Sequence, residues 1–176
     1  MARAAKLDLR AFQRELATRL ASKTAAQVEQ SRLGLHCGGQ QWLIRLADAA
    51  EVINVPGVAA VPMTRPWFLG VANLRGNLYT VIDFGGFLGG EPASAQGALV
   101  QSRLIVFGPR AGELRAGIVV PRVLGLRNLA LLAPAAAPAD SPAWYGQRWM
   151  DADGGTWQEI DLAALAQDAA FLQVGI

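Results

Sequence analysis

Residues 67–84 read WFLGVANLRGNLYTVIDF. Two apolar runs, 68–72 and 78–84, have the composition of β-strands, and the polar segment between them is typical of a turn. Gly76 can adopt the positive φ that a tight reversal needs, and either asparagine of the segment can close a side-chain turn. The stretch therefore predicts a hairpin with Arg75 at its corner. An arginine fixed at such a corner favours docking to another surface over chemistry on a substrate.

In the rest of the sequence, frequent glycines and prolines separate short segments, as in an all-β protein. The 176 residues are 52% hydrophobic and 17% charged, and 19 glycines and 9 prolines divide them into short segments. This composition is typical of a globular chain with a sizeable core and many short strands rather than a few long helices. We therefore expect an all-β barrel or sandwich.

Charge is distributed unevenly along the chain. Residues 1–32 hold seven Lys and Arg against three Asp and Glu, whereas the remainder holds nine against eleven. The body of the protein is thus nearly neutral, which argues against a phosphate-binding face and against nucleic acid as a partner. A small-barrel nucleic-acid-binding protein stays as the alternative function, because the sequence pI is about 9.1.

The sequence also predicts the compartment. Cys37 is the only cysteine, so no intramolecular disulfide can form, and this fits a reducing environment. No apolar run approaches the roughly 20 residues that span a bilayer, and the charged N-terminus lacks the apolar core of a secretory signal. We expect a cytoplasmic protein without direct membrane insertion.

Residues 1–30 differ from the rest of the chain. Apolar side chains recur there at steps of three and four, which predicts a helix with a narrow apolar stripe: Leu9, Phe12, Leu16 and Leu20. Two interpretations stay open for this helix. It packs on the remainder of the protein, or it is a separate docking element for a partner.

Strands and turns alternate through the remainder. The expected elements are hairpins over residues 32–46, 103–120 and 148–160, followed by a short C-terminal helix. Gly38 and Gly39 supply the turn of the first hairpin. The second ends at Pro121, because proline cannot donate a ladder hydrogen bond, and Asp161 caps the helix.

Few reactive groups converge in the sequence. His36 is the only histidine, and as a strand neighbour of Cys37 it points to the opposite face, so the two form a poor dyad. A zinc site of usual composition is not available, and the segment Asp151-Ala152-Asp153-Gly154 lacks the later glutamate of a calcium loop. We expect no metal, no cofactor and no catalytic residue. An enzyme using His36, Cys37 and Asp83 would require a structure that brings all three into one pocket.

The hairpin motif and its surroundings resemble the CheW domain over roughly residues 31–168. The central tetrapeptide is Asn73-Leu74-Arg75-Gly76. The segments that support the resemblance are Phe68-Leu69-Gly70-Val71, Val81-Ile82-Asp83-Phe84, Leu88-Gly89, Gly38-Gly39-Gln40, residues 103–107, residues 117–120 and the closing residues 160–165. Thr80 and Pro121 stand where the family often has a proline and an acidic residue. The N-terminal extension resembles the PilI branch of the family, which serves type IV pilus chemosensory systems.

The resemblance implies a definite architecture. The all-β fold would consist of two packed five-stranded, SH3-like β-barrels, with an added N-terminal helix and a short C-terminal helix. Residues 1–30 would be a helical extension and residues 31–176 the CheW-like domain. The second barrel would cover roughly residues 66–130.

The resemblance also implies an adaptor without catalysis. Such a protein couples the cytoplasmic tip of a methyl-accepting chemoreceptor to the regulatory domain of a CheA-type histidine kinase. It is cytoplasmic and is recruited to membrane receptor arrays. The resemblance to the PilI branch implies twitching motility as the output, and flagellar swimming stays open as the alternative. The residues that the resemblance assigns to partner binding are Asn73, Arg75 and Gly76 at the receptor- and kinase-facing corner, Leu69, Val71 and Val81 along an apolar groove between the barrels, and Asp83, which would orient the turn or pair with an arginine.

Overall fold

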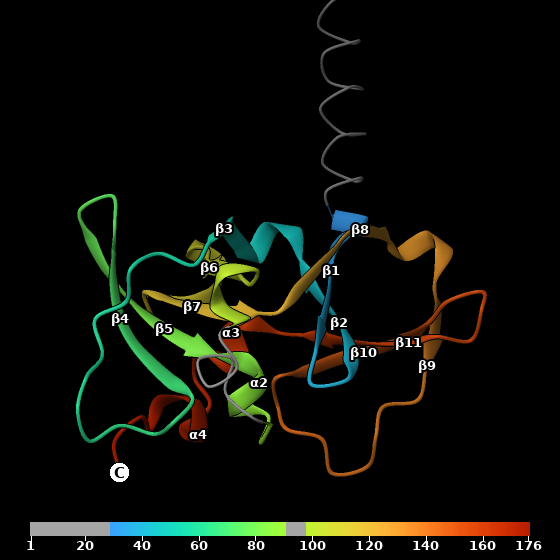
Figure 1. Cartoon of the computed structure of the whole chain (residues 1–176). Helices are drawn as coiled ribbons and strands as arrows, with labels where there is room; N and C mark the ends of the chain where they lie inside the picture. Colours follow the sequence, from blue (N-terminus) through green and yellow to red (C-terminus); the bar gives the residue numbers. More distant parts are fainter. Residues whose placement is uncertain (1–28, 91–97) are drawn as a thin grey trace, which may run out of the picture.

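The computed structural model describes residues 29–90 and 98–176, and its strands form two sheets (Figure 1). The strands are β1 (Ser31–Cys37), β2 (Gln40–Arg45), β3 (Ala49–Asn54), β4 (Phe68–Leu74), β5 (Asn77–Asp83), β6 (Arg103–Phe107), β7 (Ala116–Val120), β8 (Arg122–Asn128), β9 (Ala133–Ala135), β10 (Tyr145–Met150) and β11 (Thr156–Ile160). The six-stranded sheet has the order β8-β1-β2-β11-β10-β9, and the five-stranded sheet has the order β3-β6-β7-β5-β4. Parallel pairing occurs between β11 and β2 and between β5 and β7.

Helical segments in the described residues are short, which confirms the all-β class. They are η1 (Leu46–Asp48), α2 (Phe84–Phe87), η3 (Ala98–Val100), η4 (Pro109–Ala111), η5 (Leu129–Leu131), α3 (Leu162–Leu165) and α4 (Ala169–Leu172). The carboxylate of Asp161 caps α3, as expected, by accepting from the Ala164 amide at 3.0 Å. The predicted C-terminal helix is nevertheless two helices, because Asp168 caps α4 separately.

The helix predicted over residues 1–30 lies almost entirely outside the described residues, including its stripe of Leu9, Phe12, Leu16 and Leu20. Glu29 and Gln30 are helical and lead directly into β1. The Glu29 carboxylate pairs with Arg110 at 3.3 Å, and its carbonyl accepts from the Arg32 guanidinium at 2.6 Å. These two contacts fix the point at which the chain enters the six-stranded sheet.

The division of the strands between the two sheets does not follow the boundaries expected for the second barrel, roughly residues 66 and 130. β3 precedes residue 66 but pairs with β6 in the five-stranded sheet, and β8 precedes residue 130 but pairs with β1 in the six-stranded sheet. Pro121 explains the crossing, because β7 ends at Val120 where the ladder loses a donor and the chain passes to the other sheet. The short β9 adds a sixth strand outside β10, where the resemblance implied five.

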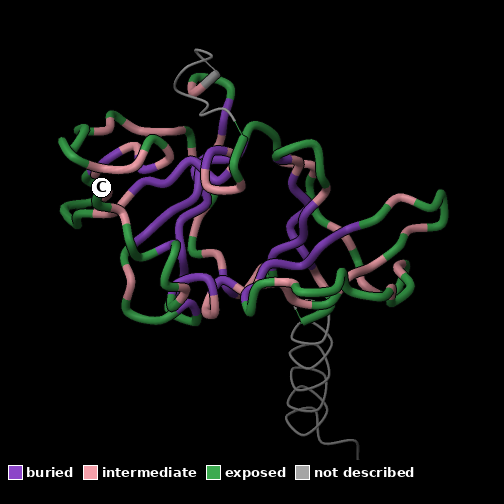
Figure 2. The backbone as a smooth tube through the Cα atoms, turned by 90° about the horizontal axis from the view of Figure 1, so that it is seen from below, coloured by how far each residue is buried: buried purple, intermediate pink, exposed green. Residues whose placement is uncertain are grey.

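Apolar side chains of both sheets form a shared core between them. Figure 2 shows the buried stretches of the backbone in purple. It combines apolar residues of β1 and β2 with those of β5, β6 and β7, and α2, α3 and α4 contribute to it. Aromatic rings occupy its centre, and Trp42 contacts Phe84 edge to face at 5.3 Å between centroids. Phe107 and Phe171 stack at 6.1 Å, which ties the C-terminal helices to the five-stranded sheet.

Each sheet has a second buried face. In the five-stranded sheet this face carries a small apolar core formed by Ala72, Val81, Leu104, Val106 and Val119. In the six-stranded sheet the alternation along β2 turns Leu43 and Arg45 away from the shared core, which receives Trp42 and Ile44. That face is polar: the buried Glu159 accepts from Arg32, Arg45 and Trp149.

The predicted turns are confirmed at both ends of the six-stranded sheet. Gly38 and Gly39, which join β1 and β2, have φ values of 59° and 74°. Asp151 closes the β10–β11 turn, where its carboxylate accepts from the Gly155 amide at 2.7 Å and from Trp157 Nε1 at 2.9 Å. The Trp157 hydrogen bond, followed by that of Gly155, lowers the pKa of Asp151. The Asp151 carboxylate thus closes a turn, and it also accepts from the Asp153 amide at 3.1 Å.

Candidate docking surface

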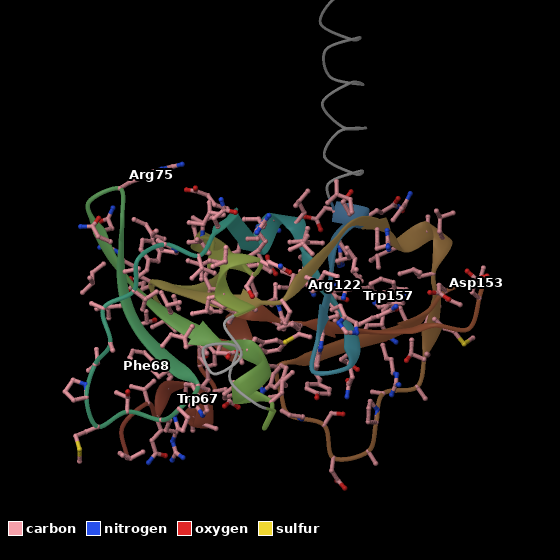
Figure 3. All side chains as sticks on the ribbon, in the orientation of Figure 1. Trp67, Phe68, Arg75, Arg122, Asp153 and Trp157 are labelled. Atoms are coloured by element: carbon pink, nitrogen blue, oxygen red, sulfur yellow. The ribbon has the colours of Figure 1, made fainter. Side chains whose placement is uncertain are left out.

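The β4–β5 hairpin presents Arg75 at its tip. Arg75 and Gly76 occupy the two loop positions with φ values of 52° and 84°, the pattern of a type I′ turn. The Asn73 side chain accepts from the Gly76 amide at 2.8 Å and fixes the reversal. Figure 3 shows Arg75 at one end of the hairpin, with Trp67 and Phe68 at the opposite end beside α2. The predicted turn is confirmed, and its positive φ extends to the arginine itself.

Arg75 forms a two-pronged ion pair with Glu51 of β3. Nη2 lies 2.9 Å from Oε2 and Nη1 lies 2.9 Å from Oε1. β3 and β4 are the two edge strands of the five-stranded sheet, so this contact shows that the sheet curls until its edges approach each other. A second contact between the edges comes from the chain after β3, where Ala59 pairs with Val71. The ion pair orients the Arg75 side chain, which nevertheless remains 80% exposed.

Other exposed groups surround this corner. The neighbouring Leu78 is 61% exposed, and the Asn77 side chain accepts from Arg115 of the β6–β7 loop at 3.0 Å. We call the set made by the half-buried Glu51 and the exposed Asn73, Arg75, Gly76, Asn77, Leu78 and Arg115 the turn face. It combines an anchored guanidinium with an exposed leucine, a composition typical of protein–protein contact sites.

The remaining predicted site residues lie away from the turn face. Leu69 and Val71 are half-buried on β4 and pack on the second core and the shared core, respectively. Val81 is completely buried in the second core, so it does not line an accessible groove. Asp83 is at the other end of β5, where it caps α2 by accepting from the amides of Gly85 and Gly86 at 3.0 and 3.3 Å. It therefore cannot orient the turn at residues 73–77.

The structure explains why position 70 of the same motif is a glycine. It forms a bulge in β4 with a φ of 131°, and an added Cβ would lie 2.1 Å from the carbonyl oxygen of Ala59. The Val71 amide donates to that same oxygen at 3.0 Å. Only glycine permits this close backbone approach, which holds the segment after β3 against β4.

The structure does not bring the candidate catalytic residues into one pocket. Cys37 is fully buried, and burial together with the nearby Asp83 carboxylate raises its pKa to about 12. A thiol in that state is a poor nucleophile. His36 alternates with Cys37 along β1 and lines a pocket on the six-stranded sheet. Within the described residues there is no cluster of three side chains suited to a metal ion.

Sequence reasoning missed Glu51, Leu78 and Arg115, and it considered Asn77 only as a residue of the turn. The composition of residues 49–54 shows a strand, but it does not show that this strand lies at the edge facing Arg75. The exposure of Leu78 could have been suspected from the sequence, because an apolar residue directly after a polar turn is not always buried. The contact of Arg115 depends on the parallel pairing of β5 with β7, which sequence alternation does not encode.

Comparisons with known proteins agree with the motif and the fold. The family model of the CheW-like domain matches residues 32–170. The chain belongs to the CheW-like family. It is 30% identical over 171 residues to Protein PilI of Pseudomonas aeruginosa, covering 93% of this chain and 90% of that protein. It also shares the fold of the scaffolding protein TtCheW from Thermoanaerobacter tengcongensis, with a TM-score of 0.66, 18% identity, and coverage of 82% and 92% of the two chains.

The family gives the turn face its context. CheW-like proteins are chemotaxis scaffolds, and the hairpin with Asn73, Arg75 and Gly76 lies inside the matched region. In the described part of this chain, every helix is too short or too polar to cross a membrane. Arg75 lies at an exposed corner of the five-stranded sheet.

Proposed function

We propose that this protein is a non-catalytic adaptor that couples the cytoplasmic tip of a methyl-accepting chemoreceptor to the regulatory domain of a CheA-type histidine kinase. The observation that carries the proposal is Arg75 at an exposed hairpin corner, with its guanidinium aligned by Glu51. Membership of the CheW-like family and the similarity to Protein PilI support it. The adaptor works from the cytoplasm at membrane receptor arrays, in a type IV pilus system that controls twitching motility.

The geometry of Arg75 suits a binding contact. A free arginine loses side-chain conformational entropy when a partner fixes it. Here the Glu51 carboxylate and the type I′ turn already restrict the guanidinium, while most of it stays accessible. Binding therefore costs less ordering, and a partner can use the remaining donors and the flat face of the group.

The other assigned residues act through the hairpin that carries Arg75. Asn73 and Gly76 shape the turn, and Leu69 and Val71 hold β4 on the two cores. Val81 and Asp83 fix the far part of β5 from inside the protein. We assign direct partner contact to the turn face and a positioning role to these buried residues.

Replacing Arg75 tests the proposal. An exposed hot-spot arginine contributes roughly 2 kcal/mol or more to binding, which corresponds to about a 30-fold change in affinity. We expect Arg75→Ala and Arg75→Glu to remain folded and to lose capture of the purified kinase regulatory domain or of a receptor-tip fragment from the same cell.

Arg110→Ala is the matched control, because Arg110 is also an exposed arginine paired with a glutamate, Glu29, but lies outside the turn face. It should bind both partners like the unmodified protein. Unchanged capture of both partners by Arg75→Glu would remove the assigned role of the turn face. Failure of the unmodified protein to bind either partner would remove the adaptor proposal itself.

A further inference from the structure

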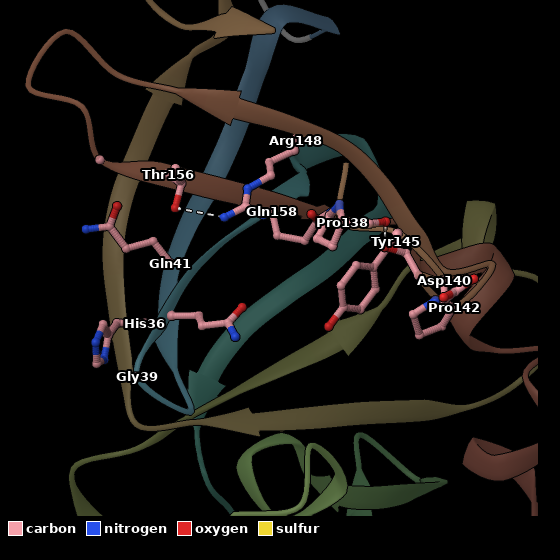
Figure 4. Close-up of a pocket in the computed structure, with 14 residues that line it drawn as sticks. His36, Gly39, Gln41, Pro138, Asp140, Pro142, Tyr145, Arg148, Thr156 and Gln158 are labelled. Atoms are coloured by element: carbon pink, nitrogen blue, oxygen red, sulfur yellow. Dashed lines mark hydrogen bonds between the residues drawn. The ribbon is translucent and has the colours of Figure 1, made fainter. Parts of the chain in front are cut away.

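Three of the four edge strands in the described sheets are protected. In the five-stranded sheet, β3 and β4 approach each other through the Arg75–Glu51 ion pair and the bridge between Ala59 and Val71. In the six-stranded sheet, β9 has only three residues and includes Pro134, and the loop after it lines a polar pocket on the sheet (Figure 4). A short strand and a proline both discourage an edge from pairing with another chain.

The fourth edge strand, β8, is longer and more open. In the described part of the chain its seven residues pair with β1 alone, and none of them is buried. A register shift after Gly34 of β1 and the positive φ of Gly125, 85°, interrupt the pairing near the middle of β8. Beyond this point Leu126 is 58% exposed, and Leu131 of η5 is 77% exposed. Soluble proteins commonly cover such an edge with a helix or a loop.

The chain enters the six-stranded sheet beside these two leucines. Ser31 of β1 lies opposite Asn128 in the register, and Asn128 lies between Leu126 and Leu131 along the chain. The ion pair and the carbonyl contact of Glu29 fix this point of entry. The 28 residues that precede Glu29 in the sequence therefore begin next to the open edge.

Residues 1–28 have the apolar surface that could cover this edge. A helix over residues 8–20 would be about 20 Å long, and the stripe predicted along one side of it consists of Leu9, Phe12, Leu16 and Leu20. The nine residue steps from Leu20 to Glu29 reach up to roughly 30 Å when extended, so the stripe can turn back onto its own sheet. A tethered segment meets this surface at an effective concentration of roughly millimolar. This favours the same chain over a second copy as the occupant.

We propose that residues 1–28 fold back on their own chain and place the stripe against Leu126 and Leu131. Contact between these apolar side chains removes them from water, and the segment then covers the free edge of β8. The covered edge belongs to the six-stranded sheet and Arg75 to the five-stranded sheet. This inference therefore stands or falls separately from the adaptor proposal.

A spin label within residues 1–28 of the full-length protein tests this. Thr18→Cys places the label on the side of the predicted helix opposite the stripe, and the Cys37 thiol is fully buried and does not compete for it. Nuclear magnetic resonance then follows the leucine methyl signals. We expect Leu126 and Leu131 to lose most of their signal intensity until the label is reduced. Leu172 of α4, which lies on the far side of the molecule from β8 (Figure 1), should keep its intensity.

Mixed chains distinguish the same molecule from a second copy. Spin-labelled protein of natural isotope composition is mixed with isotope-labelled unmodified protein, so that only contact between two molecules can reduce the observed signals. We expect Leu126 and Leu131 to keep their full intensity in this mixture. Loss of these signals in the mixture would identify a second copy as the occupant and would overturn the proposal.

Two serine variants of the spin-labelled chain locate the contact. Leu16→Ser should restore much of the intensity of Leu126 and Leu131, because it removes an apolar side chain from the stripe. Ala11→Ser introduces the same residue on the opposite side of the predicted helix and should leave the signals weak. Full intensity before either change, or the same result with both variants, would overturn the proposal and would leave the edge of β8 open to a partner protein.

Discussion

The Arg32 guanidinium donates to the Glu159 carboxylate over 2.8 Å inside the six-stranded sheet, and both side chains are more than nine-tenths buried. Arg45 and Trp149 donate to the same carboxylate at 3.2 Å each. These donors come from β1, β2 and β10, while Glu159 comes from β11. One carboxylate thus joins four strands from the two ends of the chain.

Removing Glu159 should destabilise the protein strongly. Glu159→Ala leaves the buried Arg32 without its counter-charge, and breaking a buried pair from one side costs about 3–5 kcal/mol. Urea unfolding measures the loss. Glu51→Ala is the control, since it removes an exposed ion pair worth about 1 kcal/mol or less. A loss below about 1 kcal/mol in Glu159→Ala would show that the network contributes little.

Gly70→Ala should be as damaging as a core mutation. The added Cβ would lie 2.1 Å from the Ala59 carbonyl oxygen, at a φ of 131° that alanine adopts poorly. We expect a loss of about 2 kcal/mol or more, or failure to fold. Gly76→Ala provides the comparison, because Gly76 also has positive φ but has open space around it. That variant should lose only about 1–2 kcal/mol from backbone strain, and thermal unfolding of the two proteins distinguishes crowding from strain.

The pair of Arg75 with Glu51 should matter more for binding than for stability. Because the pair is largely exposed, the single changes Arg75→Ala and Glu51→Ala should each cost about 1 kcal/mol or less in unfolding experiments. A double-mutant cycle should give a coupling of about 0.5 kcal/mol. Exchanging the charges, with Arg75→Glu and Glu51→Arg together, should restore that coupling but not partner capture. Restored capture would mean that the partner needs the ion pair and not the position of the guanidinium.

The buried thiol of Cys37 should make stability decrease at alkaline pH. Its pKa rises from an ordinary value of 9.0 to about 12 in the folded protein, so between these values the unfolded chain ionises first. The unfolded state then binds fewer protons than the native state, and the free energy of unfolding falls by up to about 1.4 kcal/mol per pH unit. Cys37→Ala removes this titration. The stability difference between the two proteins should change above pH 9, and a constant difference would contradict the prediction.

Much of the fold could be predicted because local chemistry specified it. Alternating residues and glycine turns identified the hairpins around Gly38 and Arg75, and Pro121 correctly marked the end of β7. The neighbours of each strand could not be predicted. Nothing in residues 156–160 shows that β11 lies parallel to β2 rather than at an edge, because this pairing depends on the shared core that both strands help to form.

The candidate site shows the same division. The turn carrying Arg75 is local and was predictable, whereas its partner Glu51 lies 24 positions earlier and meets it only because the sheet curls. The family resemblance assigned Asp83 to orienting the turn or pairing with an arginine. Asp83 lies at the far end of the seven-residue strand β5, away from the turn, and the Phe84-Gly85-Gly86 sequence after it was the overlooked sign of a helix cap.

The place of β11 between β2 and β10 has a consequence for protein synthesis. All strands of the five-stranded sheet lie between residues 49 and 120, so that sheet can assemble while the ribosome is still translating the remainder. The six-stranded sheet cannot, because β1 and β2 emerge first but wait for β11, which ends at residue 160. A product cut short before residue 156 would therefore leave β2, one of its earliest strands, without its neighbour β11.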